Sequence, residues 1–569
     1  MRFVGSSLEK FWIGTVSFIL FSTLLAMVLS IRGLNAGTAV LALGVGALAT
    51  AFTVWRVRLG RETMLPADSW QWRAAAWIAF LLFAARAFLW LLFEKGDQYA
   101  VLSKNNLGDL PLHIQYIRFF SHGAQLWPVN PIHAHSTIGY PFGVDYFNAL
   151  LDVCGAPIVN ALIVTGLVCS LAAAAALYRW GRAFGMAGFL FNGGAVGLAI
   201  FTTSQWLDYQ QEVDWKSIPL ALFVTQRGFL YALPAGLLLL TQWRQRQMEE
   251  TPSGRGLPFW LEWLIYATMP LFHLHTFLFL SVVLGALALF EKERRRPFCL
   301  GAAAFLPATC LVYLLTDGFH AGSHLGWMPG WMQGETFSVT YWLRNFGMLP
   351  FFMGWLLVVL VKGRAGNALV FVGPAVLVFV ATLFVKFSPW EWDNTKLMMW
   401  SYLLILPFLW KVLVEKTPPS VRVFSCLLLF VSGFVSLCAG LGPTEKGYDI
   451  AKKAHVLSVT QAVKEIPVTE VFAAAPGHAH PLVFTGRRLA LAYHGHMTGH
   501  GIPYGKEKDA MDRLMNGADD WQSAAKELGV RYIYWGEEEE KTWPASEKPW
   551  VSAAELVATE TWGEIYKLP

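Results

Sequence analysis

Long runs of apolar residues recur along most of this 569-residue chain. Runs of about 18 or more residues with few charges can cross the hydrocarbon core of a bilayer as helices. Clear examples are Phe11–Ile31, Ala36–Trp55, Ala74–Phe93 and Val421–Gly440. The pattern predicts a polytopic α-helical membrane protein. The first run is too long for the core of a signal peptide, so we expect it to remain in the protein.

The apolar pattern stops near residue 442, and residues 1–442 are therefore expected to form the membrane domain. From residue 445 to residue 569, helical patterns such as Lys506–Asn516 alternate with short strand patterns such as Val530–Trp535. This alternation predicts a small soluble α/β domain. The composition agrees with a membrane protein, because 55% of the residues are hydrophobic and only 15% are charged.

The positive charges predict an orientation in the membrane. Basic clusters near Arg56, Arg179, Arg244 and Lys362 can all face the cytoplasm if the spans alternate regularly. The N-terminus is then cytoplasmic, and the C-terminal domain lies outside. This arrangement needs an odd number of crossings, and we expect about thirteen transmembrane helices.

The count of thirteen depends on one short hairpin between Trp260 and Phe290. Each leg would have only about 15 residues, fewer than the roughly 20 of a full span, and the turn would fall near His273. Polar turns at membrane depth are tolerated where they line a protein cavity. A single long helix in this segment would instead give twelve spans.

A long polar loop, residues 94–152, follows the third apolar run and is expected outside. Loops of this length are usually functional or disordered, and its many aromatic residues and prolines favour order. Asp109 begins an amphipathic stretch, and His113 is four residues later, on the same face of a helix. The pair could be a general base with its partner. Asp109 could also satisfy amides at a helix N-terminus, and the spacing leaves both interpretations open.

An acidic outer segment contains Asp208, Glu212 and Asp214. Oxygen ligands of this kind suit Mg²⁺ or Mn²⁺, so a divalent cation is a possible cofactor; a solvated acidic loop is the alternative. Arg227 follows near the outer end of the next span. A charge there is costly unless it is paired or reaches the interface, so Arg227 could bind a phosphate or could simply snorkel.

Two further polar groups lie at expected outer ends of spans. His273 and His275 could ligate a metal, contact a phosphate or pack structurally. Asp393 and Asn394 fit the N-cap of a later apolar run, and Lys396 falls in its first turn, where helix electrostatics disfavours a cation. An anionic ligand such as a lipid phosphate would explain that lysine. The alternative is an Asp393–Lys396 ion pair within an aromatic belt.

These features together resemble the GT-C superfamily of integral-membrane glycosyltransferases. The resemblance is carried by the first large outer loop with its acid, from Gly108-Asp109-Leu110 to Asp152, by Glu212-x-Asp214, and by Asp393-Asn394-Thr395-Lys396. The tail segments Tyr493–Gly501 and Gly529–Gly536 look like tails of bacterial members. The chain departs from the pattern in two ways: the loop follows the third span, and the tail has no Trp-Trp-Asp motif.

The resemblance implies an enzyme of a bacterial cytoplasmic membrane that takes a sugar from a polyprenyl-phosphate donor. Asp109 would be the general base of an inverting transfer, with His113 beside it. Lys396, Asn394, Asp393, Arg227, His273 and His275 would bind the donor and its lipid phosphate. The acceptor could be a glycan, a lipid or a protein, and no nucleic acid is expected as a partner.

The rival class is a transporter or flippase of lipid-linked glycans. A transporter needs polar groups that face both sides, or a site at the membrane midplane between repeats. No repeat is visible in this chain. Its fourteen histidines, His320 and His324 among them, all fall in segments that are expected outside. This distribution favours the enzyme.

Overall fold

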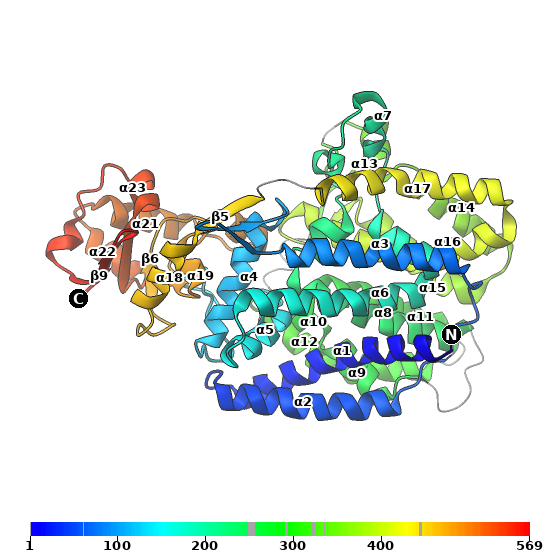
Figure 1. Ribbon diagram of the computed structural model, residues 1–569, viewed down its shortest axis with the longest axis horizontal. Coiled ribbons are helices and arrows are strands. Elements are labelled where there is room, and N and C mark those ends of the chain that lie inside the picture. Colours follow the sequence, from blue (N-terminus) through cyan, green and yellow to red (C-terminus); the bar gives the residue numbers. More distant parts are fainter. Residues whose placement is uncertain are drawn as a thin grey trace.

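The computed structural model describes residues 2–60, 62–248, 256–290, 294–319, 325–334, 336–442 and 447–569. A bundle of long helices carries a smaller domain of helices and strands at one end (Figure 1). The expected domain boundary at residues 443–444 lies outside the described residues, as do His320 and His324.

Within the described ranges, seven helices are long and apolar enough to cross a membrane. They are α1 (Arg2–Leu29), α2 (Ala36–Arg56), α3 (Trp70–Leu89), α6 (Ile158–Leu190), α12 (Arg295–Leu315), α16 (Asn394–Lys416) and α17 (Pro419–Gly440). An eighth candidate is the pair α13 (Val339–Phe346) and α14 (Leu349–Lys362), which is bent by 79°. The predicted polytopic helical fold is confirmed. The number thirteen stays a prediction, because other candidate spans are short or broken.

The segment from Trp260 to Phe290 forms the predicted hairpin. It contains α9 (Phe259–Ala267), α10 (Met269–Phe272) and α11 (Leu274–Phe290), and His273 separates the last two. The Tyr266 hydroxyl at the end of α9 lies 2.8 Å from Oγ of Ser281 on α11, so the two legs meet across the break at His273. The turn therefore falls at His273, where the sequence pattern places it.

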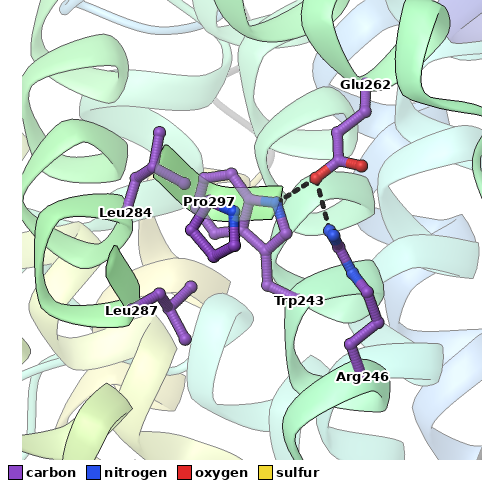
Figure 2. Close-up of a pocket in the computed structure, with 6 residues that line it drawn as sticks. All are labelled: Trp243, Arg246, Glu262, Leu284, Leu287 and Pro297. Atoms are coloured by element: carbon purple, nitrogen blue, oxygen red, sulfur yellow. Dashed lines mark hydrogen bonds and ion pairs between the residues drawn. The ribbon is translucent and has the colours of Figure 1, made fainter. Parts of the chain in front are cut away.

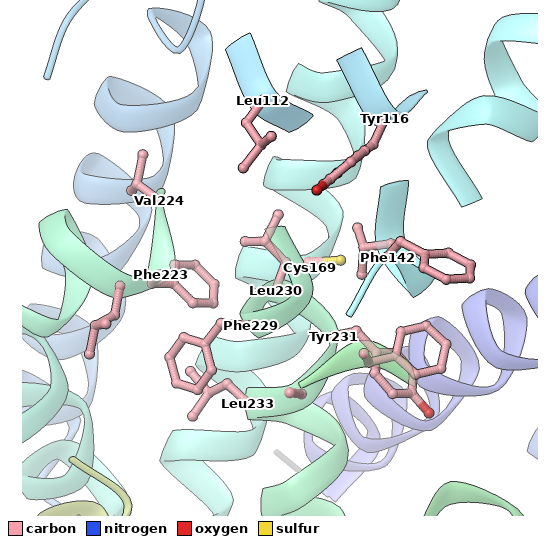
Figure 3. Packing of buried hydrophobic residues seen from close by; sticks show 14 of the residues in the cluster. Leu112, Tyr116, Phe142, Cys169, Phe223, Val224, Phe229, Leu230, Tyr231 and Leu233 are labelled. Carbon is pink, nitrogen blue, oxygen red and sulfur yellow. The ribbon is translucent and has the colours of Figure 1, made fainter. Parts of the chain in front are cut away.

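The outer loop is ordered and largely buried. It consists of β1 (Phe93–Lys95), β2 (Gln98–Val101), α4 (Asn106–Ser121) and α5 (Gly143–Val153). Its side chains Leu112, Tyr116 and Phe142 lie close to Phe229 and Leu230 of α8 (Arg227–Met248) (Figure 3). All of these side chains belong to one buried apolar cluster. The apolar face of the loop therefore continues the core of the membrane domain.

The C-terminal domain is the predicted α/β unit. Its sheet has the strand order β7-β6-β8-β10-β9. The central strand β6 (Val471–Ala473) runs parallel to β7 (Arg488–Leu489) and β8 (Tyr532–Gly536), whereas β10 (Gly563–Lys567) pairs antiparallel with β8 and with β9 (Glu555–Glu560). The helices are α18 (Lys453–Ala462), α19 (Pro481–Phe484), α20 (His494–His500), α21 (Gly505–Asn516), α22 (Trp521–Glu527) and α23 (Glu537–Thr542).

Backbone hydrogen bonds join this domain to the outer loop at two places. The strand β5 (Tyr448–Lys452) adds to β2 of the loop. Farther along the chain, the Leu489 amide donates to the Pro131 carbonyl at 2.8 Å, and the Ala492 amide donates to the Ile132 carbonyl at 3.0 Å. Because the loop also packs into the helix bundle, these bonds position the C-terminal domain at the end of the bundle that carries this loop.

The opposite end of the bundle is held by buried ion pairs. Glu262 is fully buried and accepts hydrogen bonds from Trp243 and Arg246, beside a small indentation that Leu284 lines (Figure 2). Arg296 pairs with the same carboxylate at 2.8 Å. Removing one partner of such a pair strands a buried charge, so the network fixes how α8, α9 and α12 meet.

Candidate active site

The site begins with α4, which carries Asp109 and His113 on one face. His113 is almost completely buried, and its Nδ1 lies 2.9 Å from Oδ2 of Asp145 on α5, whose side chain is equally buried. Asp109 is partly buried, one turn before His113. It is the acidic residue of the first turn of α4, so both interpretations, a helix-terminus acid and a general base, fit its position.

A second charged pair comes from α16. Nζ of Lys396 lies 2.9 Å from Oδ1 of Asp393, and both side chains are largely buried. The Ser388 hydroxyl donates to the other carboxylate oxygen of Asp393 at 3.0 Å. The charges of Lys396 and Asp393 both shift the pKa of Asp109. The Asp393–Lys396 pair of α16 and the residues Asp109 and His113 of α4 therefore share one site.

His273 and His275 lie beside the same lysine. The electric field of Lys396 acts on both imidazoles, whose ring centroids are 5.8 Å apart. Trp400 donates its indole N–H to the Thr276 hydroxyl, which lies 2.8 Å from Nδ1 of His273. The Thr276 backbone amide donates to Nδ1 at 3.2 Å, so Nδ1 is an acceptor and Nε2 of His273 carries the proton. That Nε2–H donates a long hydrogen bond to Oε1 of Gln226, at 3.4 Å.

Tyr140 connects the two halves of the site. Its ring lies 5.9 Å from that of His113, and the charges of Asp109, Asp145 and Asp393 all act on its hydroxyl. Burial, together with these carboxylates, raises the pKa of Tyr140 well above its ordinary value. Tyr140 is therefore a neutral hydrogen-bond donor at the centre of an acidic cluster.

Asp109 has the electrostatics of a base. Burial raises the pKa of its carboxyl, whereas the nearby His113 and Lys396 oppose that rise and Asp393 adds to it. The net shift is upward. A carboxylate with a raised pKa accepts a proton more readily than an exposed aspartate does, and is therefore a better general base.

Two of the predicted donor-binding residues make their described hydrogen bonds to backbone carbonyls. Asn394 is fully buried, and its amide donates to the carbonyls of Thr382 and Val385 at 2.8 Å each, so it holds the preceding loop in place. Arg227 is also fully buried; it donates to the Leu162 carbonyl at 3.3 Å, and the charge of Asp145 favours its protonated form. Asp393 occupies the N-cap position of α16, as predicted, but its side chain makes no capping hydrogen bond there.

The predicted metal ligands do not converge. Oε2 of Glu212 pairs with Arg344 at 2.9 Å, Asp214 accepts from the Tyr341 hydroxyl at 3.0 Å, and Asp208 accepts from Gln211 at 3.0 Å. Each of these three acids has a different partner. Across the part of the chain that the structure describes, no group of three or more histidine, cysteine or acidic side chains could hold a metal ion. The residues do not fit the expected Mg²⁺ or Mn²⁺ site.

The sequence pattern did not identify three residues of the site: Tyr140, Asp145 and His500. His500 belongs to α20 of the C-terminal domain, and its ring stacks on Tyr140 at a centroid distance of 4.9 Å. Tyr140 and Asp145 lie in the outer loop, but nothing in their spacing separates them from its other polar residues. His500 carries only the signal of a histidine-rich segment, His494-x-His496-x-x-x-His500.

Comparison with known proteins gives structural matches only. No family model matches the chain, and no curated protein matches it. The apo oligosaccharyltransferase of Archaeoglobus fulgidus matches with a TM-score of 0.48 and 11% identity, over 88% of this chain and 75% of that chain. The same enzyme bound to an inhibitory peptide and a dolichol-phosphate matches with a TM-score of 0.46 and 10% identity, over 88% and 75% of the two chains.

The Archaeoglobus fulgidus enzyme tethered to an acceptor peptide also matches, with a TM-score of 0.48, 10% identity, and coverage of 88% of this chain and 74% of that chain. All three structures are of the same Archaeoglobus fulgidus oligosaccharyltransferase, and each has a TM-score below 0.5. At this low similarity, the function has to be argued from the site of this chain.

Proposed function

We propose that this protein is a membrane glycosyltransferase that moves a sugar from a polyprenyl-phosphate-linked donor to an acceptor, at the outer face of a bacterial cytoplasmic membrane. One observation carries the proposal: a partly buried carboxylate with a raised pKa, Asp109, shares a site with a largely buried lysine, Lys396. Sugar transfer from a lipid phosphate needs a base for the acceptor and positive charge for the leaving phosphate.

In the proposed reaction, Asp109 takes the proton of the acceptor hydroxyl. The acceptor oxygen attacks the anomeric carbon of the donor as the bond from that carbon to the phosphate oxygen breaks. The electron pair of that bond leaves with the lipid phosphate, and the anomeric configuration inverts. A positioned general base of this kind contributes about 10²–10⁴-fold to the rate.

Lys396 and the two hairpin histidines would stabilise the leaving phosphate. A lysine ammonium has three N–H donors, so Lys396 can contact a phosphate while one donor remains directed at Asp393. The Nε2–H of His273 provides a neutral donor, and His275 lies beside it. No metal step is included, since Asp208, Glu212 and Asp214 are each held by a different partner.

The position of the polar groups supports an enzyme more than a transporter. The site lies where the outer loop and the C-terminal domain meet the bundle, whereas the opposite end is held by Glu262 and by Glu62, which bonds Arg179 at 2.7 Å. A transporter must open toward both sides. The proposed donor approaches through the bilayer, and the acceptor, a glycan, a lipid or a protein, approaches from outside.

The test is transfer from a polyprenyl-phosphate sugar in proteoliposomes that contain the purified full-length protein. We expect wild type to release polyprenyl phosphate and Asp109→Asn to lose about 10²–10⁴-fold in rate. Asp519→Asn, a change at an exposed position of the C-terminal domain, serves as the matched control and is expected to keep full activity. No release by folded wild type with any such donor would refute the proposal.

A further inference from the structure

The helix α20 of the C-terminal domain lies over the proposed active site. The backbone bonds of Leu489 and Ala492 to the outer loop end two residues before α20 begins. The helix is therefore positioned by the same contacts that fix the domain on the loop. Near its middle, His496 faces the backbone of Gly108, the residue before Asp109.

The end of α20 reaches the centre of the cluster. The His500 ring stacks on Tyr140, with a centroid distance of 4.9 Å and an interplanar angle of 25°. The charges of Asp109 and Asp393 both raise the pKa of the Tyr140 hydroxyl. Stacking against the Tyr140 ring fixes the plane of the imidazole. Both ring nitrogens of His500 therefore lie in a fixed plane.

His500 lies on the Lys396 side of the site. After the neighbouring His496, the groups that act most strongly on its imidazole are Asp393 and Lys396, and His113 follows them. Burial is the main cause that lowers the pKa of His500, to about 3, and the cations nearby add to it. The imidazole is therefore neutral near pH 7 and presents one N–H donor.

We propose that His500 binds the phosphate of the lipid-linked donor, so that the C-terminal domain supplies part of the donor site. This inference rests on the proposed function and deepens it. Lys396 provides the charge, and the N–H groups of His273 and His500 provide directed hydrogen bonds from two sides. A phosphate has several acceptor oxygens, which three converging donors can satisfy together.

The alternative contact for His500 is the acceptor, and the position of the ring argues against it. An acceptor hydroxyl has to reach Asp109, which lies on α4 beside His113. Apart from the neighbouring His496, the charges that act most on the His500 imidazole are those of the α16 pair, Asp393 and Lys396, and that of His113 acts less. His500 therefore faces the place proposed for the leaving group.

The experiment compares His500→Ala and His500→Gln with wild type in the full-length protein. The control is His455→Ala, because His455 is a partly buried histidine on α18 of the same domain, outside the site. Farnesyl phosphate serves as the probe of the phosphate site and farnesol as its uncharged counterpart. Inhibition of sugar transfer by each probe, the KM for donor, the KM for acceptor and the thermal unfolding temperature are measured.

We expect His500→Ala to weaken inhibition by farnesyl phosphate about ten- to a hundred-fold, the effect of losing a hydrogen bond to a charged group. Inhibition by farnesol, the acceptor KM and the unfolding temperature should stay at wild-type values. His500→Gln, which keeps an N–H donor, should recover part of the loss and also provides a folded variant if the alanine change disturbs the domain.

Two results would overturn the inference while leaving the proposed function intact. In the first, wild type is active and the folded His500 variants are inhibited by farnesyl phosphate as strongly as wild type is. The other is a rise in acceptor KM with donor KM unchanged, which would place His500 at the acceptor. If folded wild type neither transfers sugar nor binds farnesyl phosphate, the proposed function itself fails.

Discussion

His113 and Asp145 form a buried hydrogen-bonded pair, 2.9 Å from ring nitrogen to carboxylate oxygen, that joins the two helices of the outer loop. The bond holds the imidazole one turn from Asp109. Asp145 is therefore a positioning residue in the proposed site, because it acts on the base only through His113.

Replacing Asp145 by alanine should destabilise the outer loop by about 3–5 kcal/mol, because it leaves one partner of a buried pair alone. The unfolding temperature in detergent measures this loss. Asp145→Asn keeps an oxygen that can accept a hydrogen bond from His113 and should lose less stability. Equal unfolding temperatures for Asp145→Ala and wild type would show that the pair does not hold the loop.

The pH dependence of transfer should report the ionisation of Asp109. The base works only when it is deprotonated, so kcat/KM should rise with pH and level off above the pKa of this carboxyl. Because burial raises that pKa, the rise should be centred above the ordinary aspartate value of about 4. A rate profile measured from pH 4 to pH 8 checks this, and a profile centred at or below pH 4 would contradict it.

The C-terminal domain should lose stability in acid because of Glu539. Burial tends to raise the pKa of Glu539, but His480, 3.0 Å away, and backbone amides, including that of Ala475 at 2.7 Å, outweigh burial and hold it below its ordinary value. A carboxyl with a lowered pKa stabilises the fold above the unfolded value of about 4.5 and loses that contribution as the pH falls through the folded value.

Pepsin cleavage of the full-length protein from pH 5 down to pH 2 measures this effect. Cleavage within residues 447–569 should accelerate as the pH falls below about 4.5. Glu539→Gln should already be cleaved faster at pH 5 and should depend less on pH. The exposed neighbour Glu537→Gln is the control, and identical cleavage of the two variants would remove Glu539 from this role.

Arg488 should help to hold the C-terminal domain on the outer loop. Its guanidinium donates to the carbonyls of Asn130, at 3.3 Å, and Ala134. Arg488→Ala removes both bonds, so the domain should sit less firmly on the loop. A disulfide designed between the domain and the loop should then form more slowly, and transfer activity should fall as well. Arg513→Ala removes an exposed arginine that pairs only within the domain, with Asp520 and Glu527, and should change neither readout.

Removing the Glu262 carboxylate should weaken the far end of the bundle without touching the site. Glu262→Ala leaves Arg246 and Arg296 without their buried partner and should lower stability by about 3–5 kcal/mol, seen as a lower unfolding temperature. The folded fraction should keep the kcat/KM of wild type. A loss of kcat/KM in folded protein would show that this network acts on the site.

Sequence patterns predicted the fold well where a helix, strand or turn depends only on residues close to it in the sequence. The hairpin turn at His273 follows from two short apolar runs around a polar residue, and the helices and strands of the C-terminal domain follow their own periodicity. The pairing of Asp109 with His113 on one face also needs only the helical repeat of α4.

The sequence failed where a side chain depends on distant partners. Asn394 matches an N-cap, yet it bonds the carbonyls of the loop before it. Glu212 and Asp214 are close in sequence, yet they bond Arg344 and Tyr341. No local rule predicts that His500 meets Tyr140, since about 360 residues separate them and docking of a whole domain brings them together.

The order of the chain gives that docking a consequence for biogenesis. His500 and the backbone contacts of residues 489–492 come after every candidate membrane span. During synthesis from the N-terminus, Asp109 and Lys396 are in place before the last segment arrives. A chain cut off before residue 488 would thus insert in the bilayer with an open, incomplete donor site, so carrier lipid would be bound fully only by finished molecules.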